Sequence, residues 1–297
     1  MDDKELKAYN KAGEIASEVL SHGAKMIKPG VKCLEVAEKI ESRVRDEFKA
    51  EMAFPTNISV NDVAAHYTPK HDDNFEFSED QVVKLDVGVH VDGYIADTAT
   101  TVDLTGEYGK MLEANELALE EAIKVVEPGV SVRKIGETVQ SILNKAGFKP
   151  VENLTGHELK QYDLHAGLSV PNIKVPYEWT LEEGMALAFE PFATDGAGHV
   201  IESTTAEIYS LLDEKPTRMR EARMLLKAVR EREALPFAAR WYAGKINPMK
   251  LNLVLNQLTQ AEILKAYTPL HDRGKGMVSQ YEHTLVVTDD GCVVTTK

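Results

Sequence analysis

The chain has 297 residues and a formal net charge of −14. Its length is sufficient for one large α/β domain or two smaller ones, and its negative charge argues against a general nucleic-acid binder, which needs a basic surface. The polar, acidic start does not resemble a signal peptide, and no apolar run has transmembrane length. We therefore expect a cytoplasmic protein that contacts neither membranes nor specific nucleic-acid sequences.

The first part of the chain predicts two helices and a long loop. Residues 3–27 carry apolar side chains at helical spacing, and this pattern stops at Pro29-Gly30. A second amphipathic helix has Leu34 and Val44 on its apolar face. Residues 54–62, which are rich in turn formers, form a loop before the next strands.

The segment Val83–Thr98 predicts a β-hairpin with Asp92-Gly93 as its two-residue turn. This turn would place Asp97 opposite Gly88, so that Asp86 and Asp97 are diagonal neighbours within ~7–8 Å. Two carboxylates in apolar strands need a compensating positive charge, which implies a cation. Two alternatives remain: one acid faces solvent, or a distant arginine pairs with both. A bulge could also change the turn while keeping the shared face.

The sequence then repeats its organisation. After a predicted helix at 107–126, the motif M-I-K-P-G-V at 26–31 is echoed by V-V-E-P-G-V at 125–130, and an amphipathic helix follows each copy. The strand that ends at Asp86 corresponds to the strand that ends at Glu190, 104 residues later. We expect two related α/β halves with helices outside a shared sheet or barrel and a site in the cleft between them.

The last third contains a predicted helical insertion, residues 212–272, with helices over 216–234 and 250–267. Its excess of Lys and Arg is typical of a solvated helical face, and a docking surface for the ribosome is the alternative hypothesis. Strand texture returns at 281–288, and Glu282 adds an acid at the start of this strand.

Five acids and histidines in strand-like contexts are candidate ligands: Asp86, Asp97, His157, Glu190 and Glu282. Oxygen donors with one imidazole suit a pair of ions such as Mn, Fe, Co or Zn better than a closed structural zinc site. Two such ions would neutralise the acids and share a hydroxide, which indicates hydrolysis. We expect Gly156 to let the backbone turn and aim His157. His66 and His165 are further candidates, although a single histidine is more often packed or exposed than functional.

These residues resemble the methionine aminopeptidases. The resemblance rests on D-V-G at 86–88, I-A-D-T at 95–98, T-G-H at 155–157, F-E-P at 189–191 and Q-Y-E-H-T at 280–284. The A-A-H-Y-T-P motif and the insertion resemble the archaeal and eukaryotic type II branch. The resemblance implies an α/β (α+β) pita-bread fold, with two pseudo-symmetric halves around a central curved antiparallel sheet and with outer helices. It also implies a monomer with one catalytic domain, 1–297, containing the 212–272 insertion subdomain.

The resemblance further implies two divalent metal ions, Co, Mn, Fe or Zn. Asp86 and Asp97 would hold one ion, Asp97 and Glu282 would bridge, and His157 and Glu190 would complete the second site. Three catalytic roles follow from the same resemblance. Glu190 would carry the proton of the attacking water, His165 would contact the substrate and stabilise the tetrahedral intermediate, and His66 would contact the substrate at the pocket mouth.

The activity implied is removal of N-terminal methionine from nascent proteins and peptides with a small second residue, by attack of a metal-bridging hydroxide. Methionine selectivity needs an apolar pocket, for which Phe54, Ile58 and Tyr267 are the candidates. Two alternatives stay open. An Xaa-Pro dipeptidase or aminopeptidase of the same fold uses the same ligands, and a catalytically inactive pita-bread protein would serve as a binding module but would have lost ligands.

Overall fold

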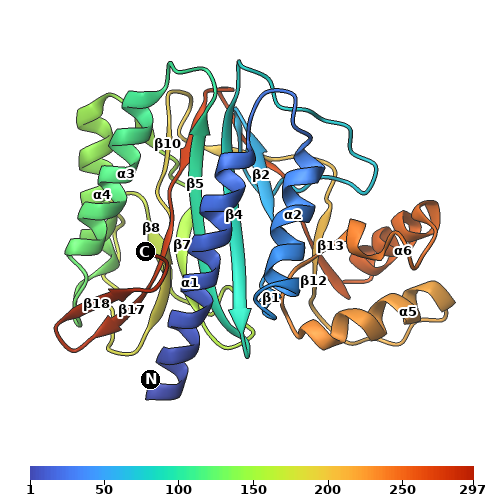
Figure 1. Ribbon diagram of the computed structural model, residues 1–297. Coiled ribbons are helices and arrows are strands. Elements are labelled where there is room, and N and C mark those ends of the chain that lie inside the picture. The colour runs from blue at the N-terminus through green and yellow to red at the C-terminus, as the bar shows by residue number, and fades with distance from the viewer.

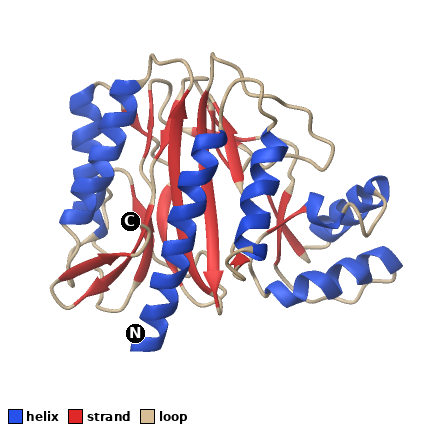
Figure 2. Cartoon of the chain, viewed as in Figure 1, coloured by secondary structure: helices blue, strands red, loops and turns tan.

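Two pairs of long helices lie across the same face of the strands in the computed structural model, which describes residues 1–297 (Figure 1 and Figure 2). These helices are α1 (Asp3–Met26), α2 (Cys33–Asp46), α3 (Gly109–Lys124) and α4 (Val132–Ala146). One buried apolar cluster lies mainly between α1, α2 and the first strands, and a second lies between α3, α4 and the later strands. The predicted layer of outer helices is confirmed.

Two larger antiparallel sheets form the centre of the molecule. The first has the order β1-β4-β2 with β5 paired to β4, and the second has the order β18-β17-β9-β7-β8. A bridge between Ala99 and Glu282 joins the two sheets. Their strands are β1 (Glu51–Met52), β2 (Asn57–Val60), β4 (Val82–Val91), β5 (Tyr94–Asp103), β7 (Thr155–Leu159), β8 (Ser169–Pro171), β9 (Ala186–Phe189), β17 (His283–Thr288) and β18 (Gly291–Val294).

Three smaller sheets complete the fold, with the orders β16-β10-β6, β11-β15-β3 and β13-β12-β14. Their strands are β3 (Val63–Ala65), β6 (Lys149–Pro150), β10 (Phe192–Thr194), β11 (Val200–Glu202), β12 (Ile208–Leu211), β13 (Phe237–Ala238), β14 (Leu264–Tyr267), β15 (Leu270–Asp272) and β16 (Val278–Gln280). No helix combines the length and the apolar composition needed to cross a membrane.

The hairpin of β4 and β5 has the predicted register. Val91 pairs with Tyr94, so Asp92 and Gly93 form a two-residue turn, and Gly88 pairs with Asp97. Both turn residues have left-handed backbone angles, with φ of 53° and 86°, as a type I′ turn requires. The turn therefore fixes the two acids as diagonal neighbours on one face.

The two halves repeat each other down to single backbone hydrogen bonds. Gly30 and Gly129, which are the glycines of the two echoed motifs, both have left-handed backbone φ angles. Gly30 donates to Phe77, and Gly129 donates to Leu181 with the same 2.8 Å distance. Each motif then leads into the second helix of its pair. The predicted internal repeat is thus confirmed as a structural pseudo-symmetry.

The predicted helix at 250–267 is wrong in its second part. Helix α6 (Pro248–Gln260) ends at Ala261, and Glu262 takes a left-handed angle with φ of 54°. The following residues pair with β12 as strand β14 instead. Tertiary pairing with a distant strand therefore overrides the local helical pattern.

A helical lobe, which we define as residues 208–267, projects beside α2 (Figure 1). It contains β12 to β14, α5 (Arg220–Val229), α6 and the 3₁₀ helices η1 (Arg230–Arg232) and η2 (Ala239–Tyr242). The lobe has its own apolar cluster, which runs from Tyr209 to Leu264. Strand β15 belongs instead to the sheet with β11 and β3. The boundary 212–272 stays a prediction for the subdomain.

Candidate metal centre

The five predicted ligands line one cavity, although they come from distant parts of the chain. Asp86 and Asp97 lie on neighbouring strands of the first half. His157 lies on β7, Glu190 directly follows β9, and Glu282 directly precedes β17. The cavity therefore lies where the two halves meet, as the repeat predicts.

Asp97, His157 and Glu282 form the tightest part of this cluster, because one ligand atom from each lies within 4.8 Å of the others. His157 Nε2 is 3.8 Å from an oxygen of Asp97 and 3.5 Å from an oxygen of Glu190. Asp86 lies on the strand paired with that of Asp97 and lines the same cavity. Metal–ligand bonds of about 2.0–2.2 Å place two ligands of one ion about 3–4 Å apart, so these gaps suit a shared ion.

Several atoms of the cluster are buried without a hydrogen-bond partner. They are Asp86 Oδ1, Asp97 Oδ1, Glu282 Oε1 and His157 Nδ1. The side chains lie deep, since Asp97 is 4% exposed and Glu282 is 2% exposed. A buried polar atom without a partner costs about 1–3 kcal/mol, and more if it is charged. Unpaired carboxylate oxygens beside an imidazole are the donor set of a divalent transition metal, so the residues present fit such an ion.

Burial and mutual repulsion control the protonation of the metal-free cluster. Burial raises the pKa of Asp86 to about 7. The pKa values of Asp97, Glu190 and Glu282 lie well above their usual range, because of burial first and neighbouring carboxylates second. Burial, reinforced by His165, lowers the pKa of His157 to about 3. The carboxylates thus resist ionisation together unless a cation replaces their protons.

Neither alternative for the acid pair holds. Asp97 is buried, Asp86 Oδ1 is buried as well, and His157 is the one basic group within 4 Å of either acid. No arginine pairs with Asp86 or Asp97. A bound cation is therefore the compensation that remains for the ionised pair.

The strands that carry Asp97 and Glu282 are fastened to each other. Thr284 Oγ1 accepts from the Asp97 backbone N–H at 2.7 Å and donates to the Asp97 carbonyl at 2.8 Å. Gln280 donates to Glu282 at 3.1 Å. Gln280 and Thr284 each lie two residues from Glu282. Because side chains in extended chain alternate between two faces, this spacing of two could have identified Gln280 and Thr284 as the residues that support Glu282 and Asp97.

The other predicted histidines stand beside the cluster. The His165 ring is 4.5 Å from the His157 ring, and it stacks on Tyr267 at 6.4 Å. His66 meets Tyr267 edge to face at 5.6 Å. The backbone of His66 is left-handed, with φ of 65°, an angle that is uncommon for residues other than glycine. All three side chains line the same cavity as the acids.

Two of the three residues predicted for the apolar pocket line the cavity. Phe54 and Tyr267 line the cavity, whereas Ile58 is fully buried in the apolar cluster beneath α1 and α2. Asn57 pairs with Asp86 and lines the cavity in place of Ile58. Successive residues of a strand face opposite sides of the sheet. Asn57 therefore faces the cavity, and its neighbour Ile58 faces the apolar core.

Sequence reasoning missed most of the remaining cavity wall. Besides Asn57, the missed residues are Ala65, Leu164, Ile208 and Pro236. Ala65 directly precedes His66, and Leu164 directly precedes His165. Their positions next to predicted site histidines could have identified both as cavity residues. Ile208 and Pro236 come from the helical lobe, and no local pattern marks them.

The predicted role of Gly156 is wrong. Gly156 lies within β7 and has no left-handed backbone angle. A Cβ atom at this position would lie 2.2 Å from the carbonyl oxygen of Ala188 on β9. The glycine therefore allows β7 and β9 to approach closely, and His157 pairs with Ala188, two residues before Glu190.

The chain is similar to known metallopeptidases along nearly its whole length. The model of metallopeptidase family M24 matches residues 7–289. A methionine aminopeptidase of Archaeoglobus fulgidus is 48% identical, and the match covers 100% of both chains. One from Methanocaldococcus jannaschii is 45% identical over 99% of this chain and 100% of that protein.

Solved structures show the same fold at lower identity. A methionine aminopeptidase from Rickettsia prowazekii superposes with a TM-score of 0.73 at 22% identity, covering 100% of this chain and 98% of that chain. The predicted pita-bread fold is thereby confirmed. Together with the full-length matches, the buried cluster of carboxylates and His157 identifies the chain as a member of metallopeptidase family M24.

Proposed function

We propose that the chain releases the N-terminal methionine of nascent proteins and peptides whose second residue is small. The observation that carries this proposal is a cavity lined by both unpaired carboxylates and apolar side chains, in a chain related over its full length to archaeal methionine aminopeptidases. The polar lining suits a free amine and a scissile carbonyl, and the apolar lining suits a methionine side chain.

The cluster would hold two divalent ions, with Co, Mn, Fe and Zn as the candidates. Asp86 and Asp97 would hold one of them. Asp97 and Glu282 would bridge the pair, and His157 with Glu190 would complete the second site. When bound, such ions lower the pKa of water toward neutrality and polarise a carbonyl group.

The protein side chains would then manage the proton and the developing charge. Burial keeps the pKa of Glu190 above its usual range, so this carboxyl group is suited to take up a proton and deliver it to the leaving amine. His165, beside the His157 ring, would donate an N–H to the oxygen that becomes negative at the attacked carbon. His66 would contact the substrate near Tyr267.

Phe54 and Tyr267 would receive the methionine side chain, together with Ile208 and Pro236. The carboxylates that line the cavity would pair with the free amine of a chain end, which an internal peptide bond lacks. This chemistry favours an exopeptidase.

The setting of the reaction is also part of the proposal. We expect a cytoplasmic monomer with one catalytic domain, 1–297, in which 212–272 is a subdomain. The insertion 212–272, with its excess of Lys and Arg, would contact the ribosome, where nascent chains emerge. In support, Met249 is 81% exposed and Leu253 is 52% exposed on α6, beside Lys250. Unchanged co-sedimentation with ribosomes after replacement of the Lys and Arg residues of α5 and α6 would contradict this contact.

The test of the activity compares wild type with Asp97→Ala on Met-Ala-Ser and on an Xaa-Pro peptide. We expect the wild type to release methionine and to prefer Met-Ala-Ser. The variant should lose both activity and bound metal, as counted by elemental analysis. Retained activity in the variant would contradict the ligand set, and a preference for Xaa-Pro would favour the dipeptidase alternative.

A further inference from the structure

Two separate parts of the molecule build the apolar side of the cavity. Phe54 and His66 come from the segments around β2 and β3, whereas Ile208, Pro236 and Tyr267 come from the helical lobe. All five candidate metal ligands lie outside the lobe. The position of the lobe therefore determines the width of the apolar side without directly moving the metal ligands.

Arg232 connects the two walls. Its Nη2 atom donates to the carbonyls of Met52 at 2.8 Å and Ala53 at 3.3 Å, which precede Phe54. The same atom donates to the carbonyl of Pro236 at 2.9 Å. Its guanidinium group also lies 4.9 Å from the ring centroid of Trp241. One side chain of the lobe thus holds the backbone beside a cavity residue of each wall.

Glu41 on α2 makes the second connection. Its carboxylate accepts from the Thr56 backbone N–H at 3.1 Å and from Trp241 Nε1 at 2.7 Å, and it forms a buried ion pair with Arg240. Arg240 also donates to Thr68 Oγ1 at 2.6 Å. Thr56 and Thr68 follow Phe54 and His66 by two residues each, so this network holds both body segments of the wall.

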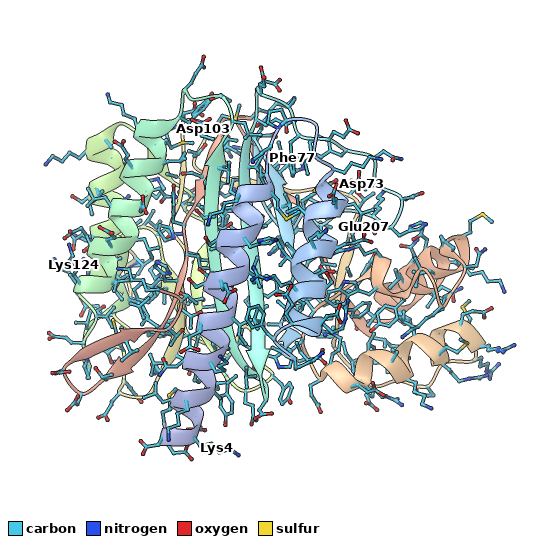
Figure 3. The ribbon with its side chains drawn as sticks, in the orientation of Figure 1. Lys4, Asp73, Phe77, Asp103, Lys124 and Glu207 are labelled. Atoms are coloured by element: carbon cyan, nitrogen blue, oxygen red, sulfur yellow. The ribbon has the colours of Figure 1, made fainter.

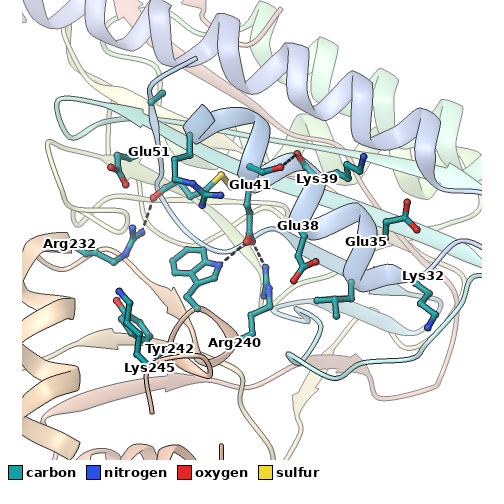
Figure 4. Close-up of a pocket in the computed structure, with 16 residues that line it drawn as sticks. Lys32, Glu35, Glu38, Lys39, Glu41, Glu51, Arg232, Arg240, Tyr242 and Lys245 are labelled. Atoms are coloured by element: carbon teal, nitrogen blue, oxygen red, sulfur yellow. Dashed lines mark hydrogen bonds and ion pairs between the residues drawn. The ribbon is translucent and has the colours of Figure 1, made fainter. Parts of the chain in front are cut away.

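These contacts form the floor of a polar groove between α2 and the lobe (Figure 4). Figure 4 shows Arg232, Arg240 and Tyr242 on the lobe side and Glu41 on the α2 side, with the hydrogen bonds crossing between them. Charged side chains rim the groove, whereas the Arg240 side chain on its floor is only 3% exposed. A charged pair buried this deeply fixes one arrangement, because breaking it leaves an uncompensated charge.

We propose that Glu41, Arg232 and Arg240 are positioning residues that fix the helical lobe against the body and so set the width of the methionine side-chain pocket. We call this group the lobe latch. The inference rests on the proposed methionine-releasing function. Its distinguishing consequence is that changes in the lobe latch alter substrate affinity and side-chain selectivity while metal binding stays the same.

Arg232→Met is the first test, because its acceptors are neutral carbonyls and no buried charge loses its partner. Arg230→Met is the matched control, since Arg230 lies two residues away on the same 3₁₀ helix, with its side chain 51% exposed. We expect the KM for Met-Ala-Ser to rise about tenfold in Arg232→Met, because small misplacements of a binding wall weaken substrate positioning strongly. The kcat should stay within about twofold.

Two further measurements separate positioning from general loss of structure. Calorimetric titration of the metal-free protein with Mn²⁺ should give the same affinity in Arg232→Met, Arg230→Met and wild type. The preference for Met-Ala-Ser over Leu-Ala-Ser should fall in Arg232→Met but not in Arg230→Met. Trp241→Phe removes one donor to Glu41 and retains an aromatic ring beneath Arg232, and it should change KM in the same direction.

An unchanged KM and selectivity in both variants would overturn the proposal. A loss of Mn²⁺ affinity that parallels the rise in KM would also overturn the proposal, because the substitution would then disturb the metal site as well as the apolar wall. Binding of free methionine, measured by calorimetry, separates this inference from the proposed function. If the wild type released no methionine but Arg232→Met still weakened methionine binding about tenfold, the function would fail and the positioning role would stand.

Discussion

Replacing Asp86 with Asn should stabilise the metal-free protein at alkaline pH while it disrupts the candidate metal site. Burial raises the pKa of Asp86 from 3.8 to about 7 in the folded, metal-free chain. The folded state therefore keeps a proton that the unfolded state releases near pH 4. Stability from this proton is present below pH 4 and is lost as the pH rises through 7.

The size of the effect follows from the shift. A change of about 3 pKa units at about 1.4 kcal/mol each corresponds to roughly 4 kcal/mol, of which roughly 3 kcal/mol is lost between pH 5 and pH 8. Asparagine has no such proton to lose. The free energy of unfolding of Asp86→Asn, relative to wild type, should therefore rise by roughly 3 kcal/mol between these two pH values.

Urea unfolding in the presence of EDTA at pH 5 and pH 8 measures this difference. The same experiment with saturating Mn²⁺ gives the complementary result, because metal binding should stabilise the wild type much more than the variant. A difference in unfolding free energy between variant and wild type that did not change with pH would refute the reasoning that the buried carboxyl is held protonated until a metal replaces the proton.

Three further substitutions test the cavity wall and its frame. Gly88→Ala places a Cβ atom 2.1 Å from the Phe54 ring, so we expect a higher KM for Met-Ala-Ser, while Gly109→Ala, with open space around it, should leave KM unchanged. Gly156→Ala should separate β7 from β9 and weaken Mn²⁺ binding in calorimetry, because the new Cβ would meet the Ala188 carbonyl. Ile58→Val should cost about 1 kcal/mol in urea unfolding without changing KM, as a core residue does; a changed KM would return Ile58 to the pocket.

The strands and turns that carry the site could be predicted from sequence patterns, because they depend on residues close together in the sequence. The Asp92-Gly93 turn determines the pairing of β4 with β5, and the repeated Pro-Gly motifs mark the same turn in both halves. Side chains that depend on the period of two, such as Asp86 and Asp97, therefore fell on the predicted face. Once the register of the hairpin is known, it follows that Asp86 and Asp97 lie on the same face.

The cavity wall could not be predicted in the same way, because it depends on contacts between distant segments. An apolar pocket favours Ile58 by residue type, whereas the pairing of Asn57 with Asp86 places Asn57 at the cavity. Pro236 lies on the lobe, which contacts the body through Arg232, a donor to Met52 and Ala53, and through Glu41 on α2. Figure 3 shows how densely side chains fill the space between these elements.

The most direct test of the account is restoration of the chelated enzyme by single metals. After removal of bound ions, we expect no methionine release from Met-Ala-Ser, and we expect Mn²⁺, Co²⁺, Fe²⁺ or Zn²⁺ to restore it in wild type but not in Asp97→Ala. Full activity in the chelated wild type, or restoration of Asp97→Ala by the same ions, would contradict the assignment of the buried carboxylate cluster as a catalytic metal centre.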